Sequence, residues 1–221
     1  MTVVRGRRAG ALRHGVAALA LLALVFGVSG CTRGPSEAEL AGAADARDDG
    51  HQTLAGFDLA APAGSVRAAH RTVDACGSPT SDRGGFDDRH VMGYECFVVE
   101  RVVYTPADRN GQGFDVDAST QELSGRLGLT AAETWGGDLY AHGRIEVDGF
   151  TVIVEISHDR IDEPSTVGQL PVQGWHANDV VHEDDGDLLD RLPELVAAGE
   201  SEVLVATVAV RYFRDAPGAP D

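Results

Sequence analysis

The segment LYAHGRIEVDGFTVIVEISH, residues 139–158, decides the fold class, because its pattern predicts two strands joined by a tight turn. Asp148-Gly149 is typical of the two-residue type I′ turn, in which both central residues take a positive φ. Apolar and polar residues alternate on either side of this dipeptide, as they do in strands with one buried face. We therefore predict an antiparallel hairpin of residues 139–147 and 150–158.

Two other segments have the composition of strands that are covered on both faces. Residues 94–104 (YECFVVERVVY) and 201–213 (SEVLVATVAVRYF) carry apolar side chains on both alternating faces. A strand of this kind lies in a sheet that is packed on both sides. We therefore expect these two strands to join the hairpin in one sheet.

Three segments are expected to be helical. Residues 65–76 carry apolar side chains at helical spacing and are followed by a glycine and a proline, which end helices. Ser119-x-x-Glu122 has the form of a capping box that begins a short helix. Leucines at helical spacing predict a third helix around 188–196, with Pro193 in its first turn or at a kink.

This order of elements, a helix followed by β-α-β-β-α-β, predicts an α+β fold in which an antiparallel sheet is packed by helices. The pattern fits the ferredoxin-like arrangement with an extra N-terminal helix. That arrangement would place the last strand, 201–213, at a sheet edge, although the strand is apolar on both faces. Another antiparallel sheet packed by helices fits equally well. We assign residues 57–214 to a single domain and 215–221 to a disordered tail.

The N-terminal residues have the features of an export signal. Four arginines (Arg5, Arg7, Arg8 and Arg13) precede the apolar stretch 16–28. Thirteen residues are too few to cross a bilayer comfortably as a helix, whereas they suit the apolar part of a signal peptide. Whether the Sec or the twin-arginine pathway exports the chain stays open.

Val28-Ser29-Gly30-Cys31 follows this stretch and resembles the lipobox of bacterial lipoproteins, with valine in place of the usual leucine. The resemblance implies that residues 1–30 are a signal peptide, that Cys31 is acylated, and that the mature protein is anchored at the outer face of the cell membrane. The alternative is an ordinary secreted protein cut nearby. Residues 31–56 are rich in Ala, Gly and Asp. This composition predicts a flexible linker that follows the lipidated cysteine.

Charge and composition exclude several classes of function. The net charge is −17, and removing residues 1–30 takes away four arginines and no acid, which makes it −21. Nucleic acids repel such a domain, so we expect no nucleic-acid partner. The chain has no lysine, which excludes P-loop chemistry, Ser-x-x-Lys acyl transfer and pyridoxal Schiff bases.

Cys76 and Cys96 are the two cysteines that remain once Cys31 is assigned to lipid. An even remainder in an exported protein predicts a disulfide. The spacing of the pair matches no zinc or redox motif. With the elements predicted above, the bond would join the helix 65–76 to the strand 94–104.

The loop that begins at Asp108 partly matches a calcium-binding EF-hand loop. Asp108, Asn110 and Gln112 place oxygen donors at positions one, three and five, and Gly113 is at position six. Gln112 is not the usual fifth ligand, and Ser119 stands at position twelve, where a bidentate glutamate belongs. A plain polar loop is therefore the default reading, with calcium as the one candidate cofactor.

Residues 160–187 form a long segment without clear periodicity, and such segments inside compact domains are often functional. Trp175, His176, Asn178 and His182 are its candidates for binding a ligand or a partner. Trp175 could instead anchor the segment to the core. The two histidines could also join a carboxylate on a metal ion.

The sequence contains no Gly-x-Ser-x-Gly, His-Glu-x-x-His or Gly-x-Gly-x-x-Gly motif. We therefore expect a membrane-anchored extracytoplasmic lipoprotein that acts as a binding or accessory domain for an envelope protein or a small ligand. The alternative is an envelope hydrolase or metal-dependent enzyme with its site in residues 160–187.

Overall fold

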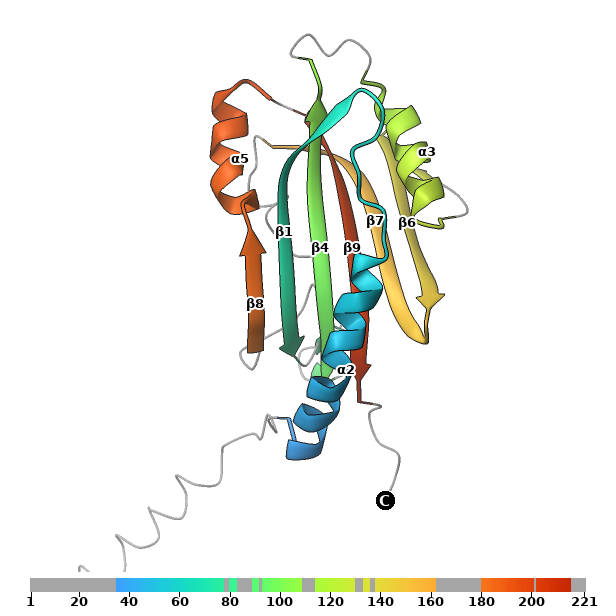
Figure 1. Cartoon of the computed structure of the whole chain (residues 1–221), viewed down its shortest axis with the longest axis vertical. Helices are drawn as coiled ribbons and strands as arrows, with labels where there is room; N and C mark the ends of the chain where they lie inside the picture. The colour runs from blue at the N-terminus through green and yellow to red at the C-terminus, as the bar shows by residue number, and fades with distance from the viewer. Residues whose placement is uncertain are drawn as a thin grey trace, which may run out of the picture. The chain divides into compact units, whose positions relative to one another are not determined.

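The computed structural model describes residues 35–77, 80–82, 89–91, 93–108, 114–129, 133–135, 138–161, 180–200 and 202–215 (Figure 1). The chain divides into two units, Met1–Gly34 and Pro35–Asp221, and these residues all belong to the second unit. Their elements, in chain order, are α2 (Glu37–Ala55), β1 (Ser65–Gly77), β2 (Thr80–Asp82), β3 (Arg89–Val91), β4 (Glu95–Pro106), α3 (Val116–Arg126), β5 (Glu133–Trp135), β6 (Asp138–Val147), β7 (Phe150–Arg160), β8 (Val180–Gly186), α5 (Leu188–Ala197) and β9 (Glu202–Arg214).

One antiparallel sheet organises the unit, with strand order β5-β6-β7-β9-β4-β1-β8. Strands β2 and β3 form a separate antiparallel pair. The α+β class, with an antiparallel sheet packed by helices, is thus confirmed. None of the helices in the described ranges is long and apolar enough to cross a membrane.

The hairpin predicted around Asp148-Gly149 is confirmed. Strands β6 and β7 pair from Ala141 opposite Ile156 to Val147 opposite Phe150. Asp148 has a φ of 52° and Gly149 a φ of 87°, the left-handed conformations that a type I′ turn requires.

The predicted helix 65–76 is wrong, because this segment is strand β1. It pairs with β4 on one side and with β8 on the other, so its backbone hydrogen bonds are made to two neighbours. A register shift between Arg67 and Ala69 interrupts the alternation of buried and exposed side chains. Such a bulge hides the period of two that identifies a strand in the sequence.

Strand β9 lies in the interior of the sheet, between β7 and β4. The ferredoxin-like alternative is therefore wrong, since it would leave this strand at an edge. An interior position also explains why β9 is apolar on both faces: eight consecutive residues, Val203–Val210, are buried.

The helices cover both faces of the sheet. Val98 and Val102 of β4 belong to one core cluster with Leu54 of α2 and Leu123 of α3. The alternate residue Val103 belongs to a second cluster, which includes three leucines of α5. Because neighbouring side chains on a strand point to opposite faces, α2 and α3 cover one face and α5 covers the other.

The expected flexible linker 31–56 is mostly helix α2, so the compact unit begins at Pro35 rather than at residue 57. Ser36 and Glu39 form a capping box at the start of the helix. The helix has only four buried residues, and three of them are small: Ala43, Gly50, Thr53 and Leu54. The helix lies so close to β9 that a Cβ added at Gly50 would come within 2.5 Å of the Tyr212 Cβ.

Helices α3 and α5 lie where the sequence predicts helices, but the N-terminal boundary of α3 differs from the prediction. Helix α3 begins at Val116 with Asp115 as its N-cap, so the predicted cap Ser119 is wrong and lies buried inside the helix. Asp115 sits one turn earlier, and its carboxylate accepts the Ala118 N–H. Helix α5 is confirmed at Leu188–Ala197, with Pro193 inside it. The tail beyond Asp215 lies outside the described residues.

Candidate functional site

An open cleft of about 320 Å³ lies where the C-terminal ends of α2 and α3 meet the turn between β6 and β7. This volume is within the range of small-molecule sites. The lining comes from three places in the chain: Gln52, Thr53, Gly56 and Phe57 around the end of α2; Arg126, Leu127 and Gly128 at the end of α3; and Ile145, Val147 and Asp148 at the hairpin.

The ends of the two helices explain why apolar side chains reach this cleft. Gly128 has a φ of 77°, and the Leu129 N–H donates to the Ser124 carbonyl at 2.8 Å, which closes α3 with a left-handed turn. Leu127 is thereby directed into the core and is 1% exposed. At the end of α2, the Phe57 N–H donates to the Leu54 carbonyl, and Phe57 packs against the same core cluster.

Arg126 is held in place at one side of the cleft by three oxygen groups. Its Nη1 donates to the Ala60 carbonyl at 2.9 Å and lies 3.5 Å from Asp58 Oδ2, and its Nη2 lies 3.2 Å from Glu122 Oε1. The Ala60 N–H, and after it the Arg126 charge, lower the pKa of Asp58. The guanidinium is therefore already neutralised by the protein's own carboxylates.

A second polar site lies under α2, around the fully buried carboxylate of Asp74 on β1. Its Oδ1 accepts from the Tyr212 hydroxyl at 2.6 Å. Its Oδ2 is bonded by Arg47 Nε and lies 2.9 Å from His51 Nε2. The cluster therefore ties α2 to β1 and β9 through one carboxylate.

The pKa of Asp74 shows which effect prevails in this cluster. Burial alone would raise it, but the bonds from Tyr212, His51 and Arg47 together lower it. The pKa of Tyr212 is raised by burial and by its bond to the Asp74 carboxylate. Both oxygens of Asp74 already accept hydrogen bonds, so the cluster has a structural role and Asp74 is not placed to act as a general base.

The predicted disulfide between Cys76 and Cys96 is present, with an S–S distance of 1.98 Å. The two residues face each other across β1 and β4, so the bond joins neighbouring strands. The prediction that it joins a helix to a strand is wrong, because residues 65–76 are a strand. The Tyr212 hydroxyl and His182 Nε2 each lie 3.5 Å from the Cys76 sulfur.

The structure covers only part of the remaining candidates. Trp175, His176 and Asn178 lie outside the described residues, as do Asn110 and Gln112 of the calcium-type loop; Asp108 is described. The described part of the chain contains no group of three or more His, Cys, Asp and Glu side chains placed to hold a metal ion. His182 is exposed on strand β8, so the segment 160–187 is not irregular throughout.

No protein-family model, no curated protein and no solved structure matches this chain.

Neither the Asp74 cluster nor the cleft was identified from the sequence. Asp74 could have been noticed had residues 65–77 been read as a strand, because Thr72, Asp74 and Cys76 then share one face. The cleft had no such signal. It is formed by the ends of elements that are far apart in the chain, and only packing brings them together.

Proposed function

We propose that the chain is a lipoprotein, held at the outer face of the cell membrane through Cys31, whose folded unit binds a small ligand in the cleft between the ends of α2 and α3. The cleft carries the binding part of this proposal, because it combines an apolar wall with a few polar groups at its edge. The signal-like residues 1–30 and the resemblance to a lipobox support the anchor.

The disulfide supports an extracytoplasmic address. Cys76 and Cys96 are both fully buried and bonded to each other. Structural disulfides persist in oxidising compartments and are rare where thiols are kept reduced. An exported chain is therefore the economical reading of this pair.

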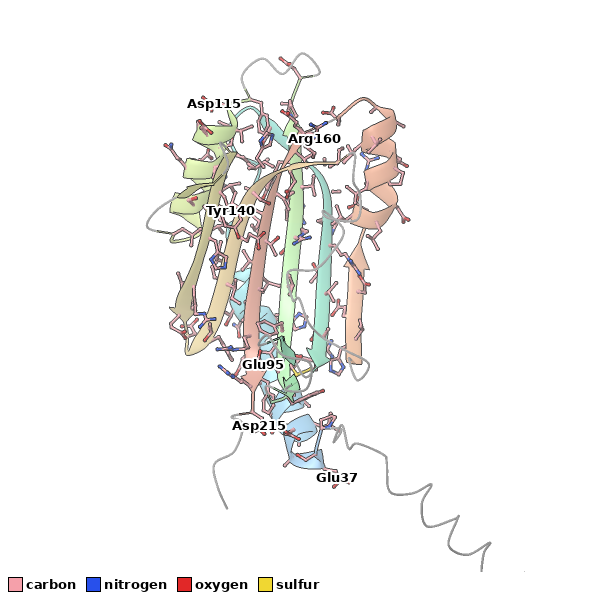
Figure 2. All side chains as sticks on the ribbon, turned by 180° about the vertical axis from the view of Figure 1, so that it is seen from behind. Glu37, Glu95, Asp115, Tyr140, Arg160 and Asp215 are labelled. Carbon is pink, nitrogen blue, oxygen red and sulfur yellow. A yellow bond between two sulfur atoms is a disulfide. The ribbon has the colours of Figure 1, made fainter. Side chains whose placement is uncertain are left out.

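Helix α2 occupies most of the predicted linker 31–56, so the connection between Cys31 and the folded unit is short. Only residues 32–35 separate Cys31 from the N-cap Ser36. The five residue steps from Cys31 to Ser36 span at most about 18 Å when fully extended, so an acylated Cys31 would keep the start of α2 close to the bilayer. Glu37, at this start, lies at the same end of the sheet as Glu95 and Asp215 (Figure 2).

The cleft lies at the other end of α2. A helix of 19 residues is about 28 Å long, which separates the cleft from the anchored end. A ligand could therefore reach the cleft from the aqueous side without first entering the bilayer. This placement suits capture or presentation of a soluble compound.

Two experiments test the proposal separately. Membrane fractionation of cells that express the chain should find it in the membrane fraction, and Cys31→Ala should release it. For binding, native mass spectrometry of the protein purified from its source should show a small molecule that Val147→Trp excludes by filling the cleft. Val66→Trp is the matched control, since Val66 is 45% exposed on β1 and does not line the cleft.

Each result bears on one part of the proposal. Retention of Cys31→Ala in the membrane would contradict lipid anchoring at this residue. A bound molecule that survives in Val147→Trp, while that variant unfolds at the same temperature as Val66→Trp, would place the binding site elsewhere. Absence of any bound molecule from the source protein would favour the accessory role over ligand capture.

A further inference from the structure

We infer that the cleft between the ends of α2 and α3 selects a small organic cation, an ammonium group carried on an apolar body. The inference rests on the proposed function, in which this cleft is the binding site. It concerns the charge and shape of the ligand, which the geometry of the cleft constrains independently of where the protein is anchored.

Two helices direct their C-terminal ends at the cleft. Gln52 and Thr53 belong to the last turn of α2, and Arg126 is the last residue of α3. The C-terminal end of a helix carries a partial negative charge, because the dipoles of its peptide groups are aligned along the axis. The last turn of α2 contains no basic residue that would offset this charge.

The charged side chains at the cleft add to this negative potential. Arg126 is the one cation in the lining, and it is paired with Asp58 and Glu122. Asp148, at the edge of the cleft, makes no ion pair with any residue that the structure describes. Three carboxylates therefore stand against one guanidinium, which disfavours an anionic ligand and leaves Asp148 available to a cation.

The remaining lining fits an apolar body next to the charged group. Phe57 offers an aromatic ring, whose face attracts an ammonium ion. Ile145 and Val147, which are only partly buried, supply aliphatic surface. A volume of about 320 Å³ corresponds to about ten water molecules, so the ligand is small.

The same chemistry could come from a free amine or from a lysine side chain on a partner protein. Both present an ammonium group at the end of an apolar chain. Their difference is the peptide backbone, which the second source must also accommodate at the edge of the cleft. The test therefore includes a probe for each.

The experiment titrates matched probes into the full chain held in micelles of a nonionic detergent, which carries no ammonium group, and follows backbone amide signals by NMR. The probes are 2-phenylethylammonium, the neutral 2-phenylethanol and the anion phenylacetate, with N-acetyl-lysine methylamide as the lysine probe. We expect the signals of Gly56, Gly128 and Asp148 to shift with the ammonium compound at millimolar concentration. The alcohol should bind at least about threefold more weakly, and phenylacetate more weakly still.

Asp148→Asn provides the charge test, because asparagine tolerates the left-handed φ of 52° that this turn position requires. It should weaken binding of 2-phenylethylammonium about threefold and leave 2-phenylethanol unchanged. Asp190→Asn is the matched control, since it removes the same charge from the exposed surface of α5, outside the cleft, and should change neither affinity.

The outcomes separate this inference from the proposed function. If phenylacetate or the alcohol shifts the cleft signals as strongly as the ammonium compound, the cleft binds ligands but the charge preference is wrong. If no probe shifts these three signals, both the ligand class and the cleft as the binding site are wrong. Stronger binding of the lysine probe than of the free amine would identify a partner side chain as the source, and weaker binding would identify a free amine.

Discussion

Replacing Gly50 by alanine should destabilise the protein, although alanine is the better helix former. Gly50 lies in α2, and a Cβ at this position would come within 2.5 Å of the Tyr212 Cβ and 2.9 Å of its Cγ. Tyr212 cannot swing aside freely, because its hydroxyl is bonded to the buried Asp74 at 2.6 Å. The helix would have to lift away from β9.

The magnitude follows from two opposing effects. Alanine gains about 1 kcal/mol over glycine in a helix interior. Overpacking of a tight contact costs about 1–3 kcal/mol, and a lifted helix also weakens the charged hydrogen bonds from Arg47 and His51 to Asp74, each contributing about 1.5–3 kcal/mol. We expect a net loss of about 2 kcal/mol in the free energy of unfolding.

Gly125→Ala is the matched control in α3, where an added Cβ meets nothing within 4 Å. It should stabilise the protein by about 0.5–1 kcal/mol. Urea denaturation followed by circular dichroism measures both variants under the same conditions. If Gly50→Ala stabilises the protein as much as Gly125→Ala does, α2 does not lie against Tyr212 as described, and the reasoning is refuted.

Three further predictions concern the Asp74 cluster and the disulfide. Asp74→Asn should cost about 3 kcal/mol in urea denaturation, because it leaves three partners, Arg47, His51 and Tyr212, without their buried carboxylate. Asp184→Asn is the control: it removes a half-exposed ion pair with Arg71 and should cost less than about 1 kcal/mol. Equal losses in the two variants would contradict the structural role of the cluster. Because the folded-state pKa of Asp74 is lowered, its contribution to stability is complete above the unfolded value of about 4 and is lost as the pH falls through the folded value. An acid titration of stability should therefore be less steep below pH ~4 in Asp74→Asn than in the parent, and identical slopes would show that Asp74 is not the group responsible. Replacing both Cys76 and Cys96 by serine opens a loop with a sequence separation of 20 residues. The free energy of unfolding should fall by about 3 kcal/mol relative to the oxidised parent. A change below about 1 kcal/mol would show that the bond does not constrain the unfolded chain.

Local patterns were sufficient for the elements whose signals are complete within a few residues. The hairpin 139–158 was predictable because its turn needs two positive φ angles and because its strands alternate without interruption. The strands at 94–104 and 201–213 were predictable from their apolar runs, and α5 from its leucines. In each case the information lies within the element itself.

Two elements were misread because their local signal is weak or broken. In β1 the bulge after Arg67 shifts the alternation, so the apolar residues fall by chance at helical spacing. In α2 the buried residues other than Leu54 are small, and they give almost no hydrophobic period. The capping box Ser36-x-x-Glu39 was the one feature of the sequence that could have indicated this helix.

The sequence by itself determined the α+β class, the hairpin, the apolar strands and the pairing of the last two cysteines, since each depends on near neighbours or on a count of residues. Only the tertiary structure decided that β9 lies inside the sheet, that α2 packs against Tyr212, and that a cleft opens between two helix ends. These features depend on contacts between residues that are far apart in the chain; Asp74 and Tyr212, for example, are 138 positions apart. A period in the sequence says which face of an element is buried, but it does not say which other element will cover that face.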